Sequence, residues 1–224
     1  MPRIPQPVRL ICFDVDGTLV DQTIYIWQTL HDHFGSDLQR RRQAQRDYLG
    51  RRISYAEWFF HDIELLRERG ADRTGIEQVI GLLAPMPGAV ETLAGLKARG
   101  YRIGVISGSL DLVLDHFFSS APIDHRLINR FVFDAEGRLA GGEPTPYDME
   151  GKAAGLRELA RREGLTLEQC AFVGDNKNDL EVMRVAGYSV GVNVKHPLVE
   201  KAVDRVVSGR DLRPLLDIFQ GILS

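Results

Sequence analysis

Two acidic segments lie far apart in the chain, and each directly follows a short apolar run. Residues 14–19 read DVDGTL after the run 8–13, and residues 174–179 read GDNKND after the run 170–173. Short apolar runs bounded by turn residues predict buried strands, so both acidic segments are expected at strand ends. Bringing their four carboxylates together costs free energy unless opposite charge compensates. A divalent cation and a phosphate group supply such charge, and hard oxygen ligands favour Mg²⁺.

Strand-like and helix-like segments alternate through the second half of the chain. The predicted strand–helix pairs are 101–107 with 110–118, 169–173 with 180–186, and 189–192 with a terminal helix near 211–223. This alternation predicts an α/β fold in which helices cover both faces of a parallel sheet. Residues 130–134 and 138–141 flank a glycine-containing turn and predict a hairpin.

Residues 21–84 differ from the rest of the chain, because they contain helical patterns and no convincing strand. Ser54 is a residue type that caps helix N-termini. Apolar and aromatic residues recur at helical spacing at Ile24, Trp27, His31 and Phe34, and again at Tyr55, Trp58, Phe59, Leu65 and Leu66. The sequence therefore predicts a core made of residues 1–20 and 85–224, with a helical insertion over 21–84.

Composition narrows the class of protein. The 224 residues carry a net charge of −3, with 26% charged and 44% apolar residues, which is ordinary for a globular protein that does not bind nucleic acid. No apolar run reaches membrane-spanning length, and residues 1–7 resemble no signal peptide. Cys12 and Cys170 lie in predicted strands and are expected to be buried, which fits a cytoplasmic protein. Nothing in the sequence indicates an obligate protein partner.

Two more motifs lie between the acidic segments, in an order that resembles the haloacid dehalogenase (HAD) superfamily of aspartyl phosphohydrolases. Residues 105–109 (VISGS) form a predicted strand with Ser107 at its end, as in the phosphate-binding second motif of that family. Lys152 opens the predicted helix 151–163, as the family's third-motif lysine does. The resemblance covers the whole chain. It implies a Rossmann-like parallel sheet core with the insertion 21–84 as a helical cap over the active site.

Further segments resemble the phosphoserine phosphatase branch of this superfamily. They are Pro87-Gly88 and residues 98–102 (ARGYR), 131–134 (FVFD), 137–139 (GRL) and 204–207 (DRVV). The likeness weakens between the first acidic segment and Pro87, where the choice of substrate is expected to lie.

The resemblance assigns the reaction to the acidic residues. Asp14 would be the nucleophile that forms an aspartyl-phosphate. Asp16 would be the general acid for the leaving alkoxide and then the general base for the attacking water. Mg²⁺ would be bound by the carboxylates of Asp14 and Asp175 and the backbone carbonyl of Asp16, while Asp179 orients metal-bound water or Lys152. The implied activity is Mg²⁺-dependent hydrolysis of a small phosphorylated metabolite.

The resemblance also implies a set of phosphate-binding groups. Lys152 and Ser107 would hold phosphoryl oxygens, with the backbone N–H groups of Val15 and Gly108 as further donors. Asn178 resembles the family's asparagine beside the last Asp and is expected on the phosphate side.

Each short motif also has a purely structural interpretation. Asp16-Gly17 is a common turn pair, and Asp175-Asn176 or Asn178-Asp179 suits a turn or a helix N-cap. Their joint occurrence with Ser107 and Lys152 favours catalysis. Hydrolysis of a carbon–halogen bond is disfavoured, because dehalogenases lack the second Asp of the first motif.

Two other functions stay open at this point. The same aspartyl-phosphate can be delivered to an alcohol instead of water, which would make the chain a phosphotransferase. A non-catalytic binding module on the same scaffold is disfavoured, because binding alone needs neither Asp14 nor Asp16.

The residues expected to select the substrate depart from the phosphoserine phosphatase pattern. Thr23 stands where that branch has an acidic residue, and Phe60 stands near the position of its cap arginine. L-Phosphoserine is therefore expected to be a poor substrate, although a phosphoserine phosphatase proper stays an alternative, with Arg51, Arg52 or Arg67 as substitute carboxylate ligands. Two positions within the motifs also differ from the family's usual pattern: Ser109 and Asn176 stand where that pattern has glycine.

Aromatic and basic residues of the insertion have ambiguous roles. The aromatic residues that either line a substrate pocket or pack the insertion are Tyr25, Trp27, Trp58, Phe59 and Phe60. Packing in the insertion's own core is the favoured interpretation for at least three of them. The arginines predicted to form a solvated helical face are Arg40, Arg41, Arg42, Arg46, Arg51 and Arg52. The histidines show no zinc-ligand spacing.

Overall fold

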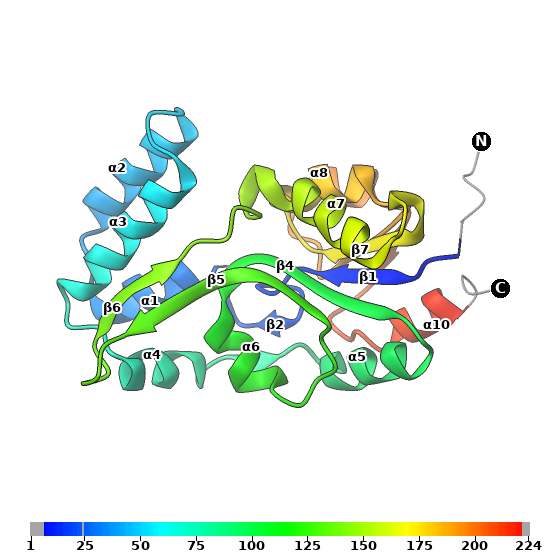
Figure 1. The fold of residues 1–224 in the computed structure, drawn as a ribbon, viewed down its shortest axis with the longest axis horizontal. Coiled ribbons are helices and arrows are strands. Elements are labelled where there is room, and N and C mark those ends of the chain that lie inside the picture. Colours follow the sequence, from blue (N-terminus) through cyan, green and yellow to red (C-terminus); the bar gives the residue numbers. More distant parts are fainter. Residues whose placement is uncertain (1–6, 24, 221–224) are drawn as a thin grey trace.

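The computed structural model describes residues 7–23 and 25–220, and these form a seven-stranded sheet in the order β6-β5-β4-β1-β7-β8-β9 (Figure 1). All neighbouring strands are parallel except β5 and β6. The strands are β1 (Leu10–Phe13), β4 (Arg102–Leu110), β5 (His125–Phe133), β6 (Leu139–Glu143), β7 (Cys170–Gly174), β8 (Tyr188–Val192) and β9 (Arg205–Val207). The predicted α/β fold with a parallel sheet is confirmed.

Strand β1 lies in the middle of the sheet, between β4 and β7. Its residues are fully buried, and its register pairs Phe13 with Val105 on one side and with Val173 on the other. Because parallel strands end at the same edge, the segments after β1, β4 and β7 meet at one place. This edge brings residues 14–19 and 174–179 together.

Helices cover both faces of the sheet, as Figure 1 shows. Side chains of a strand alternate between faces, so Ile11 and Phe13 belong to one core cluster and Leu10 and Cys12 to the other. The helices of the first cluster's face are α5 (Ala89–Ala98), α6 (Asp111–Phe118) and α10 (Pro214–Gln220), and those of the second are α7 (Lys152–Glu163), α8 (Leu180–Val185) and α9 (Pro197–Ala202). Cys12 and Cys170 are buried, as predicted.

Residues 25–80 of the insertion form four helices joined by turns and loops. It contains α1 (Ile26–Phe34), α2 (Leu38–Leu49), α3 (Tyr55–Arg67) and α4 (Arg73–Ile80). Where the insertion leaves and rejoins the core, β2 (Val20–Asp21) pairs antiparallel with β3 (Ala84–Pro85). Helix α1 begins at Ile26, while Ile24, which was expected in the same helical pattern, lies outside the described residues.

Helix α4 is placed differently from α2 and α3, which project together away from the sheet (Figure 1). It lies beside α6 in the layer below the sheet. Its N-terminus contacts the β5–β6 hairpin, where the backbone N–H of Arg73 donates to the carbonyl of Gly137 at 2.8 Å. The insertion is thus partly embedded in the core layers.

Several predicted elements differ in length from the observed ones, among them β4, which continues to Leu110 beyond the predicted end at Ser107. The predicted hairpin strand 130–134 is the end of β5, which begins at His125 and pairs first with β4 and then with β6. The segment 125–129 was missed because only Leu127 and Ile128 are apolar there. Helix α10 begins at Pro214, later than predicted, because the side chain of Asp211 accepts from the backbone N–H of Arg213 in the preceding turn.

Within the described residues, helices long and apolar enough to cross a membrane are absent.

Helix α3 carries a capping box whose removal should weaken the insertion. Ser54 Oγ accepts from the backbone N–H of Glu57, and Glu57 Oε2 accepts from the backbone N–H of Ser54 at 2.7 Å. Ser54→Ala should lower the free energy of unfolding by about 1 kcal/mol in urea denaturation. Ser119→Ala, at an exposed helix end, is the matched control and should change it by less than about 0.5 kcal/mol. Equal effects of the two substitutions would contradict the capping role.

Candidate active site

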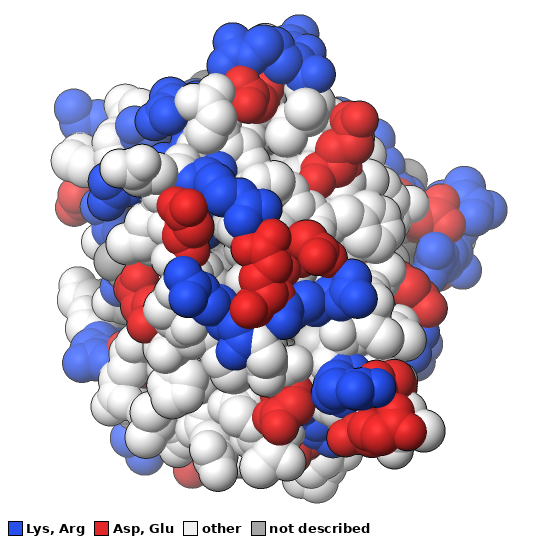
Figure 2. Space-filling model, turned by 90° about the vertical axis from the view of Figure 1, so that its left-hand side faces the viewer, with Lys and Arg blue, Asp and Glu red and all other residues white. Residues whose placement is uncertain are grey.

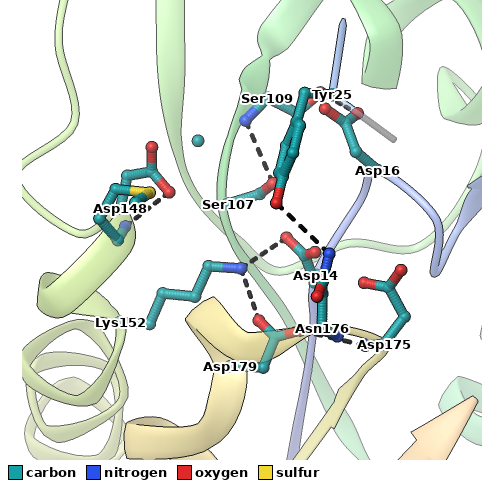
Figure 3. Close-up of polar contacts among 12 residues, drawn as sticks. Asp14, Asp16, Tyr25, Ser107, Ser109, Asp148, Lys152, Asp175, Asn176 and Asp179 are labelled. Atoms are coloured by element: carbon teal, nitrogen blue, oxygen red, sulfur yellow. Dashed lines mark hydrogen bonds and ion pairs between the residues drawn. The ribbon is translucent and has the colours of Figure 1, made fainter. Parts of the chain in front are cut away.

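Three carboxylates meet at the carboxyl edge of the sheet. Asp14 follows β1, Asp175 follows β7, and Asp179 closes the short 3₁₀ turn Lys177–Asp179. One oxygen of each lies within 4.8 Å of the others, and all three residues are buried. Figure 3 shows Asp14 and Asp175 side by side, with Asp179 below them. The structure therefore brings together three of the predicted acidic residues.

Lys152 supplies positive charge to this group from the first position of α7. Its Nζ lies 2.8 Å from Asp14 Oδ1 and 2.6 Å from Asp179 Oδ1, and its side chain is 1% exposed. Burial alone would lower the pKa of Lys152, but Asp14 and Asp179 raise it overall. The lysine is thus a fixed cation between two of the three carboxylates.

One ammonium does not balance three carboxylates. Burial, followed by the negative charge of Asp14, raises the pKa of Asp175 above its ordinary value. Burial also raises the pKa of Asp179, although Lys152 opposes the shift. Uncompensated carboxylate oxygens of this kind fit a hard divalent cation. Asp14 and Asp175 are the better placed ligands, because Asp179 Oδ2 already accepts from the backbone N–H groups of Asp175 and Asn176.

The side chain of Asp16 points away from the three carboxylates, as Figure 3 shows. Its Oδ2 accepts from the backbone N–H of Ile26 at 2.8 Å, and its Oδ1 accepts from Ser109 Oγ at 2.7 Å. Burial raises the pKa of Asp16 to about 7, with a further rise from Asp14, while both hydrogen bonds lower it. A carboxyl group that gains or loses its proton near neutral pH suits acid–base chemistry. Both side-chain oxygens of Asp16 accept hydrogen bonds, so a metal ion in this site would contact Asp16 through its backbone carbonyl.

Ser107 and Gly108 lie where the register between β4 and β5 shifts. The Oγ of Ser107 accepts from the backbone N–H of Ser109 at 3.1 Å. A Cβ at Gly108 would overlap the carboxylate of Asp148, so only glycine fits there. Asn178 lines the same cavity, and among the described residues its Oδ1 has no hydrogen-bond partner. The predicted phosphate-side residues thus surround the carboxylates.

The sequence did not identify several residues of this site. Asn129 Nδ2 donates to the carbonyl of Gly108 at 2.7 Å and to the hydroxyl of Tyr55 at 2.8 Å. Asp148 lies beside Gly108, and burial raises its pKa. Ser109 orients Asp16, so the unusual hydroxyl at this motif position has a definite partner. A polar Asn inside a strand and an Asp one helical turn before Lys152 were the available signals.

A cavity of about 130 Å³ extends from Asp14 and Ser107 into the insertion. Its aromatic walls are Tyr25, Trp27, Tyr55, Trp58 and Phe59, and its polar residues from the insertion are Arg41, Gln45 and Asp62. Four of the five candidate aromatics line the cavity, and three of these four also pack against aromatic side chains of the insertion, as predicted: Trp27, Trp58 and Phe59. Phe60 is 48% exposed and is not part of the lining.

The two positions that were predicted to select the substrate, Thr23 and Phe60, do not line this cavity. Thr23 is buried, its Oγ1 lies 2.9 Å from Thr29 Oγ1, and it does not contribute to the described lining.

The basic stretch of the insertion is mostly a solvated surface, as predicted. Arg40 pairs with Glu68 at 2.6 Å, and Arg52 pairs with Asp47 at 2.5 Å. Figure 2 views the molecule from this side and shows acidic and basic side chains interspersed. Arg41 is the exception, because its side chain is only 16% exposed and lines the cavity.

Comparison with known proteins agrees with this site. The model of the haloacid dehalogenase-like hydrolase family matches residues 8–187, and the chain belongs to this family. The chain is 29% identical over 212 residues to a phosphoserine phosphatase of Methanocaldococcus jannaschii, covering 93% of this chain and 96% of that protein. It is 32% identical over 195 residues to the phosphoserine phosphatase SerB2 of Mycobacterium tuberculosis, covering 87% of this chain and 46% of that protein.

A solved structure supports the same assignment. The phospho-aspartyl intermediate analogue of a phosphoserine phosphatase superposes with a TM-score of 0.74 at 26% identity, covering 95% of this chain and 99% of that one. Together with the family match, this likeness identifies the chain as an enzyme of the HAD phosphatase type.

Gly17 allows the acidic segments to approach each other. Its φ is +81°, and a Cβ there would overlap Asp175 Oδ2. Gly17→Ala should strain the turn and displace the Asp175 carboxylate, lowering kcat/KM for p-nitrophenyl phosphate by about tenfold or more. Steady-state kinetics on purified protein measures the effect.

Gly137→Ala is the matched control for this prediction. Gly137 has a φ of +80° in the β5–β6 turn, and a Cβ there meets nothing within 4 Å. The control carries the same backbone strain away from the site, so its kcat/KM should stay within about twofold of the wild type. Equal losses in the two variants would attribute the effect to strain alone.

Proposed function

We propose that the chain is a Mg²⁺-dependent phosphomonoesterase that hydrolyses a small phosphorylated metabolite through an aspartyl-phosphate on Asp14. The observation that carries this proposal is the placement of Asp14. Its carboxylate lies at the cavity, 2.8 Å from Lys152 Nζ and beside Asp175, with the protonatable Asp16 two residues away. The family of the chain and its likeness to a phospho-aspartyl structure support the same reaction.

Binding of the phosphoryl group falls to residues around Asp14. Lys152 and the hydroxyl of Ser107 would donate to phosphoryl oxygens, and the backbone N–H of Gly108 and the side chain of Asn178 would add contacts. Lys152 has little freedom to move, because Asp179 fixes its ammonium at 2.6 Å. Fixed donors stabilise the charge that develops on the transferred phosphoryl group.

Two bonds change in each half of the reaction. In the first half, a carboxylate oxygen of Asp14 bonds to phosphorus while the bond from phosphorus to the leaving oxygen breaks, and Asp16 gives its proton to that oxygen. In the second half, Asp16 takes a proton from water, whose oxygen bonds to phosphorus and releases Asp14. A pKa of about 7 lets Asp16 play both parts near neutral pH.

The residues present fit a bound Mg²⁺. The carboxylates of Asp14 and Asp175 and the backbone carbonyl of Asp16 would hold it, and their uncompensated negative charge supports this assignment. When bound, the ion neutralises the repulsion between carboxylate and phosphate and polarises the phosphoryl group. Asp179 would act indirectly by positioning Lys152 and the backbone of the loop.

The proposal assigns a different role to each of the two parts of the chain. Residues 1–20 and 85–224 would form the catalytic core, and residues 21–84 would form a cap that covers the leaving group. The interspersed charges of Figure 2 support a small-molecule substrate rather than a nucleic acid. A cytoplasmic location without an obligate partner protein completes the proposal, supported by the two buried free cysteines.

L-Phosphoserine is the second candidate substrate, because the similar proteins described above bear the name phosphoserine phosphatase. Thr23 and Phe60 do not line the cavity, so the departures at these two positions do not argue against it, and the lining contains one basic and one acidic side chain of the insertion, Arg41 and Asp62. Transfer to an alcohol instead of water is tested by product analysis with and without acceptor alcohols.

Removal of the nucleophile tests the covalent route. Asp14→Asn keeps the size of the side chain but cannot form the acyl-phosphate, so turnover of p-nitrophenyl phosphate should be abolished. Asp16→Asn should be nearly as damaging, because it removes the proton donor and acceptor. Circular dichroism should show both variants folded. If Asp14→Asn kept a tenth of the wild-type rate, equivalent to about 1.4 kcal/mol of barrier, the covalent route would be wrong.

Metal removal tests the second part of the proposal. EDTA should abolish hydrolysis of p-nitrophenyl phosphate, and added Mg²⁺ should restore the rate. Ca²⁺ should bind without supporting comparable turnover, because its larger and looser coordination shell places the nucleophile and phosphate less well. Asp175→Asn should raise the Mg²⁺ concentration needed for half-maximal rate. Full activity in exhaustively chelated buffer would contradict the assignment of a required metal ion.

A further inference from the structure

The cap holds a pair of opposite charges on the wall of the catalytic cavity. Arg41 lies on α2 and Asp62 on α3, and both line the cavity that reaches Asp14. Arg41 Nε lies 3.6 Å from Asp62 Oδ2. Asp62 is 4% exposed, so this pair is an internal feature and not part of the solvated arginine face.

Each member of the pair keeps one polar atom without a hydrogen-bond partner among the described residues, although the guanidinium of Arg41 also donates to Gln28 Oε1. Within the described ranges 7–23 and 25–220, Asp62 Oδ1 and Arg41 Nε have no hydrogen-bond partner. His31 Nε2 at 3.6 Å and His61 Nδ1 at 3.9 Å approach Asp62 but lie beyond hydrogen-bond distance. A buried carboxylate without hydrogen bonds is unfavourable unless a partner arrives. Asp62 therefore offers a free acceptor to a ligand in the cavity.

Trp58 adds a free donor beside this acceptor. Its indole Nε1 is buried and, in the part of the chain that the structure describes, unpartnered. Its ring stacks on Tyr48 with centroids 4.9 Å apart, which fixes its orientation. Trp58 and Tyr55 both line the cavity. The wall thus combines fixed aromatic faces with an acceptor and two donors.

The charges around the pair disfavour a leaving group that carries a single charge. A cation at Asp62 would lie beside the guanidinium of Arg41, which already compensates that carboxylate. An anion at Arg41 would lie beside Asp62 and in a cavity whose lining also contains Asp148. A neutral group that both donates and accepts hydrogen bonds is repelled neither by Arg41 nor by Asp62. Hydroxyl groups have this property, and their carbon skeleton offers C–H faces to aromatic rings.

We propose that Arg41 and Asp62 form a hydrogen-bonding subsite for the hydroxyl groups of the leaving alcohol, and that the substrates are monophosphate esters of neutral sugars or polyols. Asp62 accepts from one hydroxyl, and Arg41 donates to a neighbouring one. Trp58 and Tyr55 pack against the carbon skeleton. This inference rests on the phosphatase function proposed above and adds the class of substrate to it.

The test compares esters that share the phosphate and differ in the leaving group. The panel is p-nitrophenyl phosphate, D-ribose 5-phosphate, glycerol 3-phosphate, O-phospho-L-serine and O-phosphoethanolamine, each assayed for kcat/KM with Mg²⁺. The wild type should favour ribose 5-phosphate or glycerol 3-phosphate over the two amino-bearing esters. Asp62→Asn should lower the ratio of kcat/KM for the best hydroxyl-bearing ester to that for p-nitrophenyl phosphate by about tenfold or more.

A neighbouring pair on the same two elements provides the control. Arg40 on α2 pairs with Glu68 at the end of α3, and both side chains are more than 40% exposed. Glu68→Gln removes a carboxylate from the cap surface and should leave that ratio unchanged. If circular dichroism shows that Asp62→Asn is unfolded, Arg41→Gln takes its place in the test. The same fall in the ratio of kcat/KM values is expected for that variant.

The outcomes separate this inference from the function on which it rests. Wild-type protein that does not hydrolyse p-nitrophenyl phosphate would overturn the phosphatase proposal itself. Hydrolysis with phosphoserine or phosphoethanolamine as the best substrate would overturn only the inference. An unchanged ratio in Asp62→Asn, or an equal change in Glu68→Gln, would also overturn it.

Discussion

The ammonium of Lys152 is the interaction on which the site depends. It lies between Asp14 and Asp179, and it is buried with them at the edge where three parallel strands end. Without it, three carboxylates within 4.8 Å of one another would repel strongly in a medium that screens charge poorly. With it, the carboxylate of Asp175 still has no ion pair with any of the described residues. The arrangement is therefore stable as a fold and still favourable for a further cation, which is the balance that a metal-dependent phosphatase requires.

Three consecutive residues at the start of α1 tie the cap to the reacting groups. The hydroxyl of Tyr25 accepts from Asn176, the backbone N–H of Ile26 donates to Asp16, and the indole of Trp27 donates to the carbonyl of Gly108. These partners belong to the three segments that follow or end β7, β1 and β4. A movement of α1 would therefore change the surroundings of the acid, the phosphate-binding turn and the acidic loop together. Cap position and catalytic geometry are coupled through this single turn of backbone.

The sequence predicted which acidic residues meet at the sheet edge better than it predicted which residues of the insertion line the cavity, and the reason is physical. Asp14 and Asp175 directly follow buried strands, and Ser107 lies inside β4, which continues to Leu110 although it was predicted to end at Ser107. The parallel sheet therefore brings these residues together. The cap depends on which face each helix turns inward. Arg40 and Arg41 are neighbours in the sequence, yet Arg40 pairs with Glu68 on the surface and Arg41 lines the cavity. Helix α2 is too polar for its pattern to show which of these faces is buried. The same limit applies to Phe59, which is buried, and Phe60, which is exposed.

The core and the cap treat buried charge in different ways. In the core, Asp14 and Asp179 are satisfied by a lysine and by backbone amides that belong to the fold. In the cap, Asp62 faces Arg41 and two histidines at distances that leave its outer oxygen without a hydrogen bond from any described residue. A permanent partner would have made Asp62 a structural residue, and the helices would then gain stability from it. In the proposed function, this unsatisfied acceptor at the cavity would cost stability and would give a bound alcohol a hydrogen bond that water in the cavity makes less well. If both proposals hold, the chemistry of phosphate transfer depends on the sheet edge, and the choice of leaving group depends on Arg41 and Asp62 on two helices.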